Sequence, residues 1–110
     1  MSLQPTEDVI IFTDKLADVY GDFLEIVDIG DCYRGVIRGD IPTKFGKFKW
    51  AIVIHKLGKF VKVQLLDEEE KILFEDELKE FQEIDKDELE ERIDLIIEKF
   101  LLKAKEMRTR

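Results

Sequence analysis

The side chains that could carry nucleophilic catalysis are few in this sequence. A catalytic nucleophile needs a neighbouring base that a third group orients. Ser2, Cys32 and His55 are the only serine, cysteine and histidine. Because Ser2 lies in a terminus that we expect to be frayed, such a site would have to combine Cys32 with His55. A single Cys and a single His in a small domain are usually structural, so the sequence favours a protein that is not an enzyme.

Acidic side chains are abundant, but their spacing selects no metal site. One Cys and one His exclude a structural zinc site within one chain. Asp28, Asp31 and Asp40 fall near the ends of predicted hairpins and could hold Mg²⁺ or Ca²⁺. The EF-hand spacing is absent, however, and solvated acids in turns are far commoner. Residues 35–39 also lack the glycine spacing that binds phosphate. We predict no metal and no cofactor, and a catalytic pair of carboxylates stays a weaker alternative.

The distribution of charge is the uneven feature of the chain. The sequence has 18 basic and 26 acidic residues, a net charge of -8, which would repel nucleic acid and anionic membranes if it were evenly spread. Residues 33–63, in contrast, hold eight bases and one acid. A hairpin in this region would carry on one face Lys47, Lys49, His55, Phe60, Lys62 and Gln64. A basic face with an aromatic ring predicts, as an alternative function, the binding of single-stranded nucleic acid.

Two observations favour a different role for these bases. Phe48 and Trp50 belong to the opposite face of the same hairpin, so few rings remain for base stacking. Surface lysines also protect sheets from aggregation, and they can pair with the acids of residues 67–91. The primary prediction is therefore a non-catalytic protein-interaction or adaptor module. Whether the basic segment is a binding face or an internal counter-charge stays open.

A helix is expected at each end of the chain. The first covers residues 6–20, where apolar side chains recur at helical spacing before Gly21. The last begins after Asp85, which forms a capping pair with Glu88, while Ile84 and Leu89 can form a hydrophobic staple. Its apolar stripe comprises Leu89, Ile93, Ile96, Ile97, Phe100, Leu101, Ala104 and Met107. Leu95 and Leu102 are expected at the edge of this stripe, where they could meet another subunit.

The segment between the two helices alternates apolar and polar residues, which is typical of strands. Gly30-Asp31 and Leu57-Gly58 are expected at the tips of two hairpins. A loop over residues 39–46 and a helical stretch around residues 76–82 are also expected. The predicted strands cover residues 24–29, 32–38, 47–56, 59–66 and 71–74. In the second hairpin one buried face should pair Trp50, Ile52 and Ile54 with Leu65, Val63 and Val61.

Together these elements predict one α+β domain that comprises residues 1–110. An antiparallel β-meander of four to five strands should follow the N-terminal helix, and the long C-terminal amphipathic helix should pack on one face of the sheet. Residues 1–5 and 108–110 are expected to be frayed. The predicted core consists of Leu24, Ile26, Ile37, Trp50, Ile52, Ile54, Val61, Val63, Leu65, Leu89, Ile93, Ile96, Ile97, Phe100 and Leu101.

Composition predicts the cellular compartment and the kind of partner. No apolar run approaches the roughly 20 residues of a membrane span, and the first residues do not resemble a secretion signal. The single cysteine fits a reducing compartment, so we expect a cytoplasmic protein with no membrane partner. Asparagine is absent and glutamine is rare, a bias typical of hyperthermophile proteins. The expected partner is another protein or a second copy in a homodimer.

Overall fold

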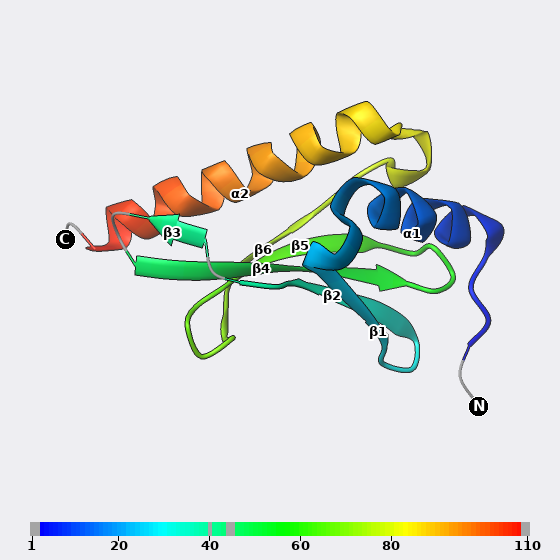
Figure 1. The fold of residues 1–110 in the computed structure, drawn as a ribbon, viewed down its shortest axis with the longest axis horizontal. Helices are drawn as coiled ribbons and strands as arrows, with labels where there is room; N and C mark the ends of the chain where they lie inside the picture. Colours follow the sequence, from blue (N-terminus) through cyan, green and yellow to red (C-terminus); the bar gives the residue numbers. More distant parts are fainter. Residues whose placement is uncertain (1–2, 40, 44–45, 109–110) are drawn as a thin grey trace.

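A computed structural model gives the structure of residues 3–39, 41–43 and 46–108. Two helices, two short 3₁₀ turns and six strands make up this part of the chain (Figure 1). The helices are α1 (Glu7–Tyr20) and α2 (Lys86–Arg108), and the 3₁₀ turns are η1 (Gly21–Phe23) and η2 (Phe81–Glu83). The strands are β1 (Leu24–Asp28), β2 (Cys32–Ile37), β3 (Ile41–Thr43), β4 (Gly46–His55), β5 (Val61–Leu66) and β6 (Ile72–Glu77).

The strands form an antiparallel sheet in the order β1-β2-β4-β5-β6, and the short β3 pairs with the start of β4. This arrangement confirms the predicted α+β fold and its meander. The prediction of a loop over residues 39–46 was wrong where it overlaps β3 and the start of β4. Gly39 has a φ of +90°, a conformation that glycine adopts without strain. It ends the extended run of β2, after which Ile41 pairs with Phe48.

The registers of both predicted hairpins are confirmed. Leu24 is opposite Ile37 in the first hairpin, and Trp50 is opposite Leu65 in the second. The tip of the second hairpin is longer than expected, because the N–H of His55 donates to the carbonyl of Phe60 (3.0 Å). Residues 56–59 therefore form a four-residue loop, in place of the predicted two-residue turn.

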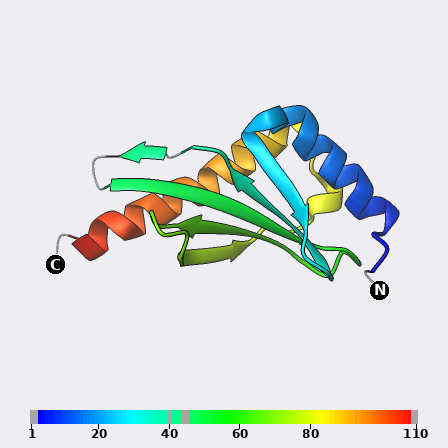
Figure 2. The ribbon, with the colours of Figure 1, turned by 60° about the horizontal axis from the view of Figure 1, so that its bottom comes forward.

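One face of the sheet carries both helices and the hydrophobic core (Figure 2, where the sheet lies in front of α2). The predicted core residues of β4, β5 and α2 are buried or packed against this core. The predicted core list omitted the buried residues of α1, which are Val9, Phe12 and Leu16. It also omitted Phe48, Leu66, Leu78, Phe81, Ile84 and Ala104. The first helix thus covers part of the sheet beside α2.

The predicted helical stretch around residues 76–82 was also wrong. Strand β6 continues to Glu77, which pairs with Lys62, and the N–H of Leu78 donates to the carbonyl of Val61 (2.7 Å). Pairing with β5 outweighs the local helical preference of this acidic segment, because propensity is a weak prior against tertiary contacts. Only the single 3₁₀ turn η2 remains, and Phe81 at its start is buried.

The start of α2 is built as the sequence predicts. The carboxylate of Asp85 accepts a hydrogen bond from the N–H of Glu88 (2.9 Å), which satisfies one of the free donors at a helix N-terminus. Ile84 and Leu89 are both buried on either side of this cap. Within the described residues, no helix is both long and apolar enough to cross a membrane.

Candidate functional site

The predicted basic surface lies on the face of the sheet that the helices leave uncovered, here named the open face. It consists of Lys49, Ala51, Val53 and His55 of β4 with Phe60, Lys62, Gln64 and Leu66 of β5 and the turn before it. The structure thus brings together five of the six predicted site residues. Lys47 lies beyond the paired part of β4 and β5, where it lines a groove with Phe48.

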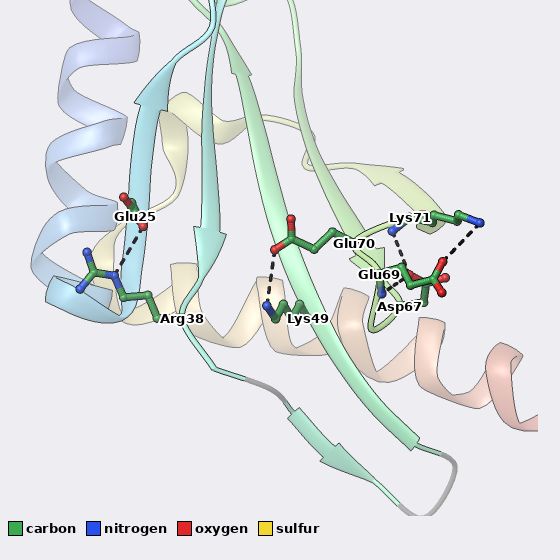
Figure 3. Close-up of polar contacts among 7 residues, drawn as sticks. All are labelled: Glu25, Arg38, Lys49, Asp67, Glu69, Glu70 and Lys71. Carbon is green, nitrogen blue, oxygen red and sulfur yellow. Dashed lines mark hydrogen bonds and ion pairs between the residues drawn. The ribbon is translucent and has the colours of Figure 1, made fainter.

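Acidic side chains pair with the lysines of the open face. Lys49 contacts Glu70 (3.4 Å) from the turn between β5 and β6, and Lys62 contacts Glu75 (3.5 Å) from β6. Figure 3 shows Glu70 reaching across β4 toward Lys49. It also shows the pair between Glu25 of β1 and Arg38, the residue that follows β2 (3.7 Å). These contacts pair three of the eight bases of residues 33–63 with acids from outside that segment.

Part of the open face is buried. Ala51 and Leu66 are fully buried although no helix covers them, and Gln64 is 6% exposed. The amide nitrogen of Gln64 donates to Glu75 (2.7 Å), so Glu75 joins Gln64 and Lys62 in one network. The amide oxygen of Gln64 has no hydrogen-bond partner among the described residues. Lys49 and Lys62 of the open face are therefore engaged in ion pairs, and part of this face is buried from solvent.

One aromatic residue of the open face is accessible. The ring of Phe60 lies 5.2 Å from the ring of His55, and the ammonium of Lys62 lies 4.7 Å from its centre. Proteins that bind single-stranded nucleic acid stack its bases on several aromatic rings beside a positively charged groove that follows the backbone. Here a single ring already has a cation over it, and Lys62 is also paired with Glu75.

Cys32 and His55, the only candidates for nucleophilic catalysis, lie directly opposite each other on β2 and β4. The ring nitrogen Nδ1 of His55 accepts the N–H of Leu57 (3.1 Å). Burial, together with the nearby Asp31, raises the pKa of the Cys32 thiol. Because an activated cysteine needs a lowered pKa, this environment opposes thiolate formation. In the described part of the chain, no three His, Cys, Asp or Glu side chains cluster as metal ligands would.

The structure also shows a buried lysine that sequence reasoning counted only as a surface base. Lys56 is 1% exposed, contacts Asp28 (2.7 Å) and lies 5.1 Å from the centre of the Tyr33 ring. Its carbonyl accepts the N–H of Thr6, and its N–H donates to the carbonyl of Asp31. Lys56 therefore joins both hairpin tips to the start of α1. No local pattern marks it, because its burial depends on the packing of distant turns.

Two leucines of α2 lie on the surface that faces away from the sheet. Leu95 and Leu102 are 51% and 56% exposed, while Leu89, Ile93 and Phe100 are buried. At about 100° per residue, the two leucines point away from the buried stripe. Their predicted place at the edge of that stripe was wrong. We name the surface around them the outward face of α2; beside Leu95 it contains a shallow hollow lined by Asp87, Glu90, Glu91, Asp94 and Glu98.

A second apolar surface lies at the other end of α2. A groove of about 510 Å³ runs between the last turns of α2, the starts of β4 and β6, and the turn that follows β5. Its apolar lining comes from Phe48, Leu73, Phe74, Ala104 and Met107, and its charged lining comes from Lys47, Asp67, Glu68 and Glu69. The sequence placed Met107 on the helix stripe, but at this end of the helix it is 67% exposed.

Comparisons with protein-family models, with curated proteins and with solved structures found no match. The fold alone also supports many unrelated functions. The physical properties of the open face and of the outward face of α2 are therefore the basis for a proposed function.

Proposed function

We propose that the protein is a non-catalytic interaction module that associates with a second copy of itself through the outward face of α2. The observation that carries this proposal is the exposure of Leu95 and Leu102, which are seven positions apart on one side of a 23-residue helix. Apolar residues that repeat every seven positions are typical of helices that pack against another helix. The fold's own core uses the opposite side of α2.

The remaining candidate sites support a role in binding rather than catalysis. Cys32 and His55 are opposite each other, but the pKa of the thiol is raised and a backbone N–H occupies Nδ1 of the imidazole. Metal-assisted chemistry has no ligand cluster to use within the described residues. Turnover of any substrate in an activity screen would contradict this part of the proposal. The cytoplasmic location stays a prediction from composition.

Light scattering on the full chain tests the self-association. We expect a dimer mass at high micromolar concentration, and a monomer mass for the variant Leu95→Gln/Leu102→Gln. Met107→Gln is the matched control, because Met107 is an exposed apolar residue of the same helix on a different face. A strictly monomeric parent protein, or equal effects of both variants, would contradict the proposal.

Binding of single-stranded nucleic acid by the open face stays the alternative function. The pairing of Lys49 with Glu70 and of Lys62 with Glu75 makes this alternative less well supported. Fluorescence anisotropy with labelled single-stranded DNA and RNA at low salt decides between the two functions. We expect no binding at tens of micromolar protein. Binding that falls steeply with salt and is weakened by Lys49→Gln, Lys62→Gln and Phe60→Ala would support the alternative.

A further inference from the structure

We infer that the two copies pair through α2 in an antiparallel orientation, with Leu95 of each copy against Leu102 of the other. This inference rests on the proposed self-association and adds its geometry. A two-fold axis would then pass between residues 98 and 99. Each leucine pair would form twice, because a two-fold interface uses the same patch on both copies.

The charge order along α2 is the first observation behind this orientation. Residues 86–98 contain six acids and two bases, whereas residues 99–108 contain four bases and one acid. The helix dipole favours acids near the start and bases near the end of a helix, but this effect falls off within the first and last turns. Glu91, Asp94 and Glu98 lie beyond the first turn of α2. The dipole therefore does not account for the acidic half as a whole.

Two helices with this charge order are complementary in only one relative orientation. A parallel pair would place acidic half against acidic half and basic half against basic half, which is unfavourable. An antiparallel pair places the acidic half of each copy beside the basic half of the other. With Leu95 against Leu102, Glu91 is level with residue 106 of the second copy. At about 100° per residue, Lys105 of that copy, one position away, lies on the same side of the helix pair as Glu91, whereas Glu106 lies on the other side.

The hollow beside Leu95 brings several acidic side chains of α2 close together, so a positive charge placed there would be favourable. It has a volume of about 340 Å³ and is lined by five acids and Leu95 itself. Burial, together with the charge of Glu90, raises the pKa of Asp94. A lysine brought in by the second copy would offset the repulsion among the five acids that line the hollow. The two leucines give only a small apolar centre, so we expect a weak dimer.

Charge reversal tests the orientation while leaving the leucines in place. Glu91→Lys and Lys105→Glu should each raise the dimer Kd about tenfold, because each change replaces two attractive pairs by two repulsive ones. The double variant Glu91→Lys/Lys105→Glu should restore the parent Kd within about threefold. An equimolar mixture of the two single variants should form heterodimers in preference to either homodimer. Sedimentation equilibrium measures the dimer Kd of the two single variants, of the double variant and of the mixture. Circular dichroism shows that each variant is folded. Additive losses in the double variant would overturn the antiparallel pairing.

Cysteine cross-linking gives a second, independent measurement of the register. In a Cys32→Ala background, Leu95→Cys and Leu102→Cys proteins should form a disulfide with each other on mild oxidation, because only facing residues come within disulfide range. Each should cross-link to itself at least fivefold less. Preferential Leu95→Cys self-cross-linking would overturn the inference and leave the proposed dimer standing. A monomeric parent protein would remove both.

Discussion

The two faces of the sheet bury their residues by different means. On the covered face, Trp50, Ile52 and Ile54 pack against α1 and α2 in a continuous apolar core. On the open face, Ala51 and Leu66 are equally buried although no helix packs there, and the neighbouring Lys49 and Lys62 form acid–base pairs. The same strands thus contribute to an apolar layer on one side and to a charged layer on the other.

This difference shows how an acidic protein can hold a strongly basic segment. Two of the bases of residues 33–63, Lys49 and Lys62, pair with acids from the turn at residues 67–70 and from β6, which are distant in sequence but adjacent in the sheet. Exposed ion pairs contribute little to stability individually, while apolar burial contributes much more. The covered face should therefore determine the stability of the fold. The open face should determine its charge distribution.

The largest expected effect is at the covered face. Ile52→Ala should lower the free energy of unfolding by about 2–5 kcal/mol, because it removes buried methyl groups and leaves a cavity. Val53→Ala is the matched control, since Val53 is the next residue of β4 and lies partly exposed on the open face. It should cost clearly less. Urea unfolding measures both variants, and equal losses would contradict the contrast between the two faces.

The ion pair between Lys56 and Asp28 should have the next largest effect, because the lysine is buried. Asp28→Asn should lower the melting temperature at pH 7, since it leaves a buried ammonium without its partner. Asp31→Asn, in the same turn, should change it less. A melting temperature unchanged by Asp28→Asn would show that Lys56 does not depend on this carboxylate.

The same pair predicts an acid dependence of stability. Hydrogen bonds from Lys56 and from the N–H of Gly30 hold the pKa of Asp28 below its ordinary value of about 3.9. A lowered folded-state pKa gives stability that is present above the ordinary value and is lost as pH falls through the folded-state value. The difference between the parent and Asp28→Asn should therefore shrink below about pH 4. A difference that stays constant down to pH 2 would contradict this assignment.

The buried hydroxyl of Tyr20, on the covered side of the sheet, is expected to lower the free energy of unfolding slightly. Its hydroxyl is buried with no hydrogen-bond partner among the described residues, and burial with the nearby Asp94 and Glu90 raises its pKa. Tyr20→Phe should therefore raise the free energy of unfolding by up to about 1 kcal/mol at pH 7. The parent protein should also lose stability as pH rises above about 10, where the unfolded tyrosine ionises first. Thermal unfolding at pH 8 and 10.5 measures both effects, and an equal alkaline loss in Tyr20→Phe would exclude Tyr20 as its source.

The smallest expected effect is on the open face. A double-mutant cycle of Lys62→Met and Glu75→Gln should give a coupling energy of about 0.2–1 kcal/mol that falls with added salt. Urea unfolding at low and high salt measures it. A coupling of several kcal/mol would show that the ion pairs, and not only the core, hold the sheet together.

The sequence by itself determined the elements whose patterns are local. Periodicity and turn residues predicted the N-terminal helix, the cap at Asp85 and the registers of both hairpins. The helix was predicted over residues 6–20 and covers Glu7–Tyr20, and the cap and the registers are as predicted. Each depends on residues within a few positions of one another, so a single sequence contains the information. The alternation of β4 likewise indicated which face would be buried.

Only the tertiary structure decided how distant segments meet. The pairing of β6 with β5 converted an acidic, helix-favouring segment into a strand, and it placed Glu75 beside Lys62. The packing of two hairpin tips against the start of α1 buried Lys56. These features arise from contacts between residues far apart in the chain, whose free energies outweigh local preferences, so no local pattern contains them.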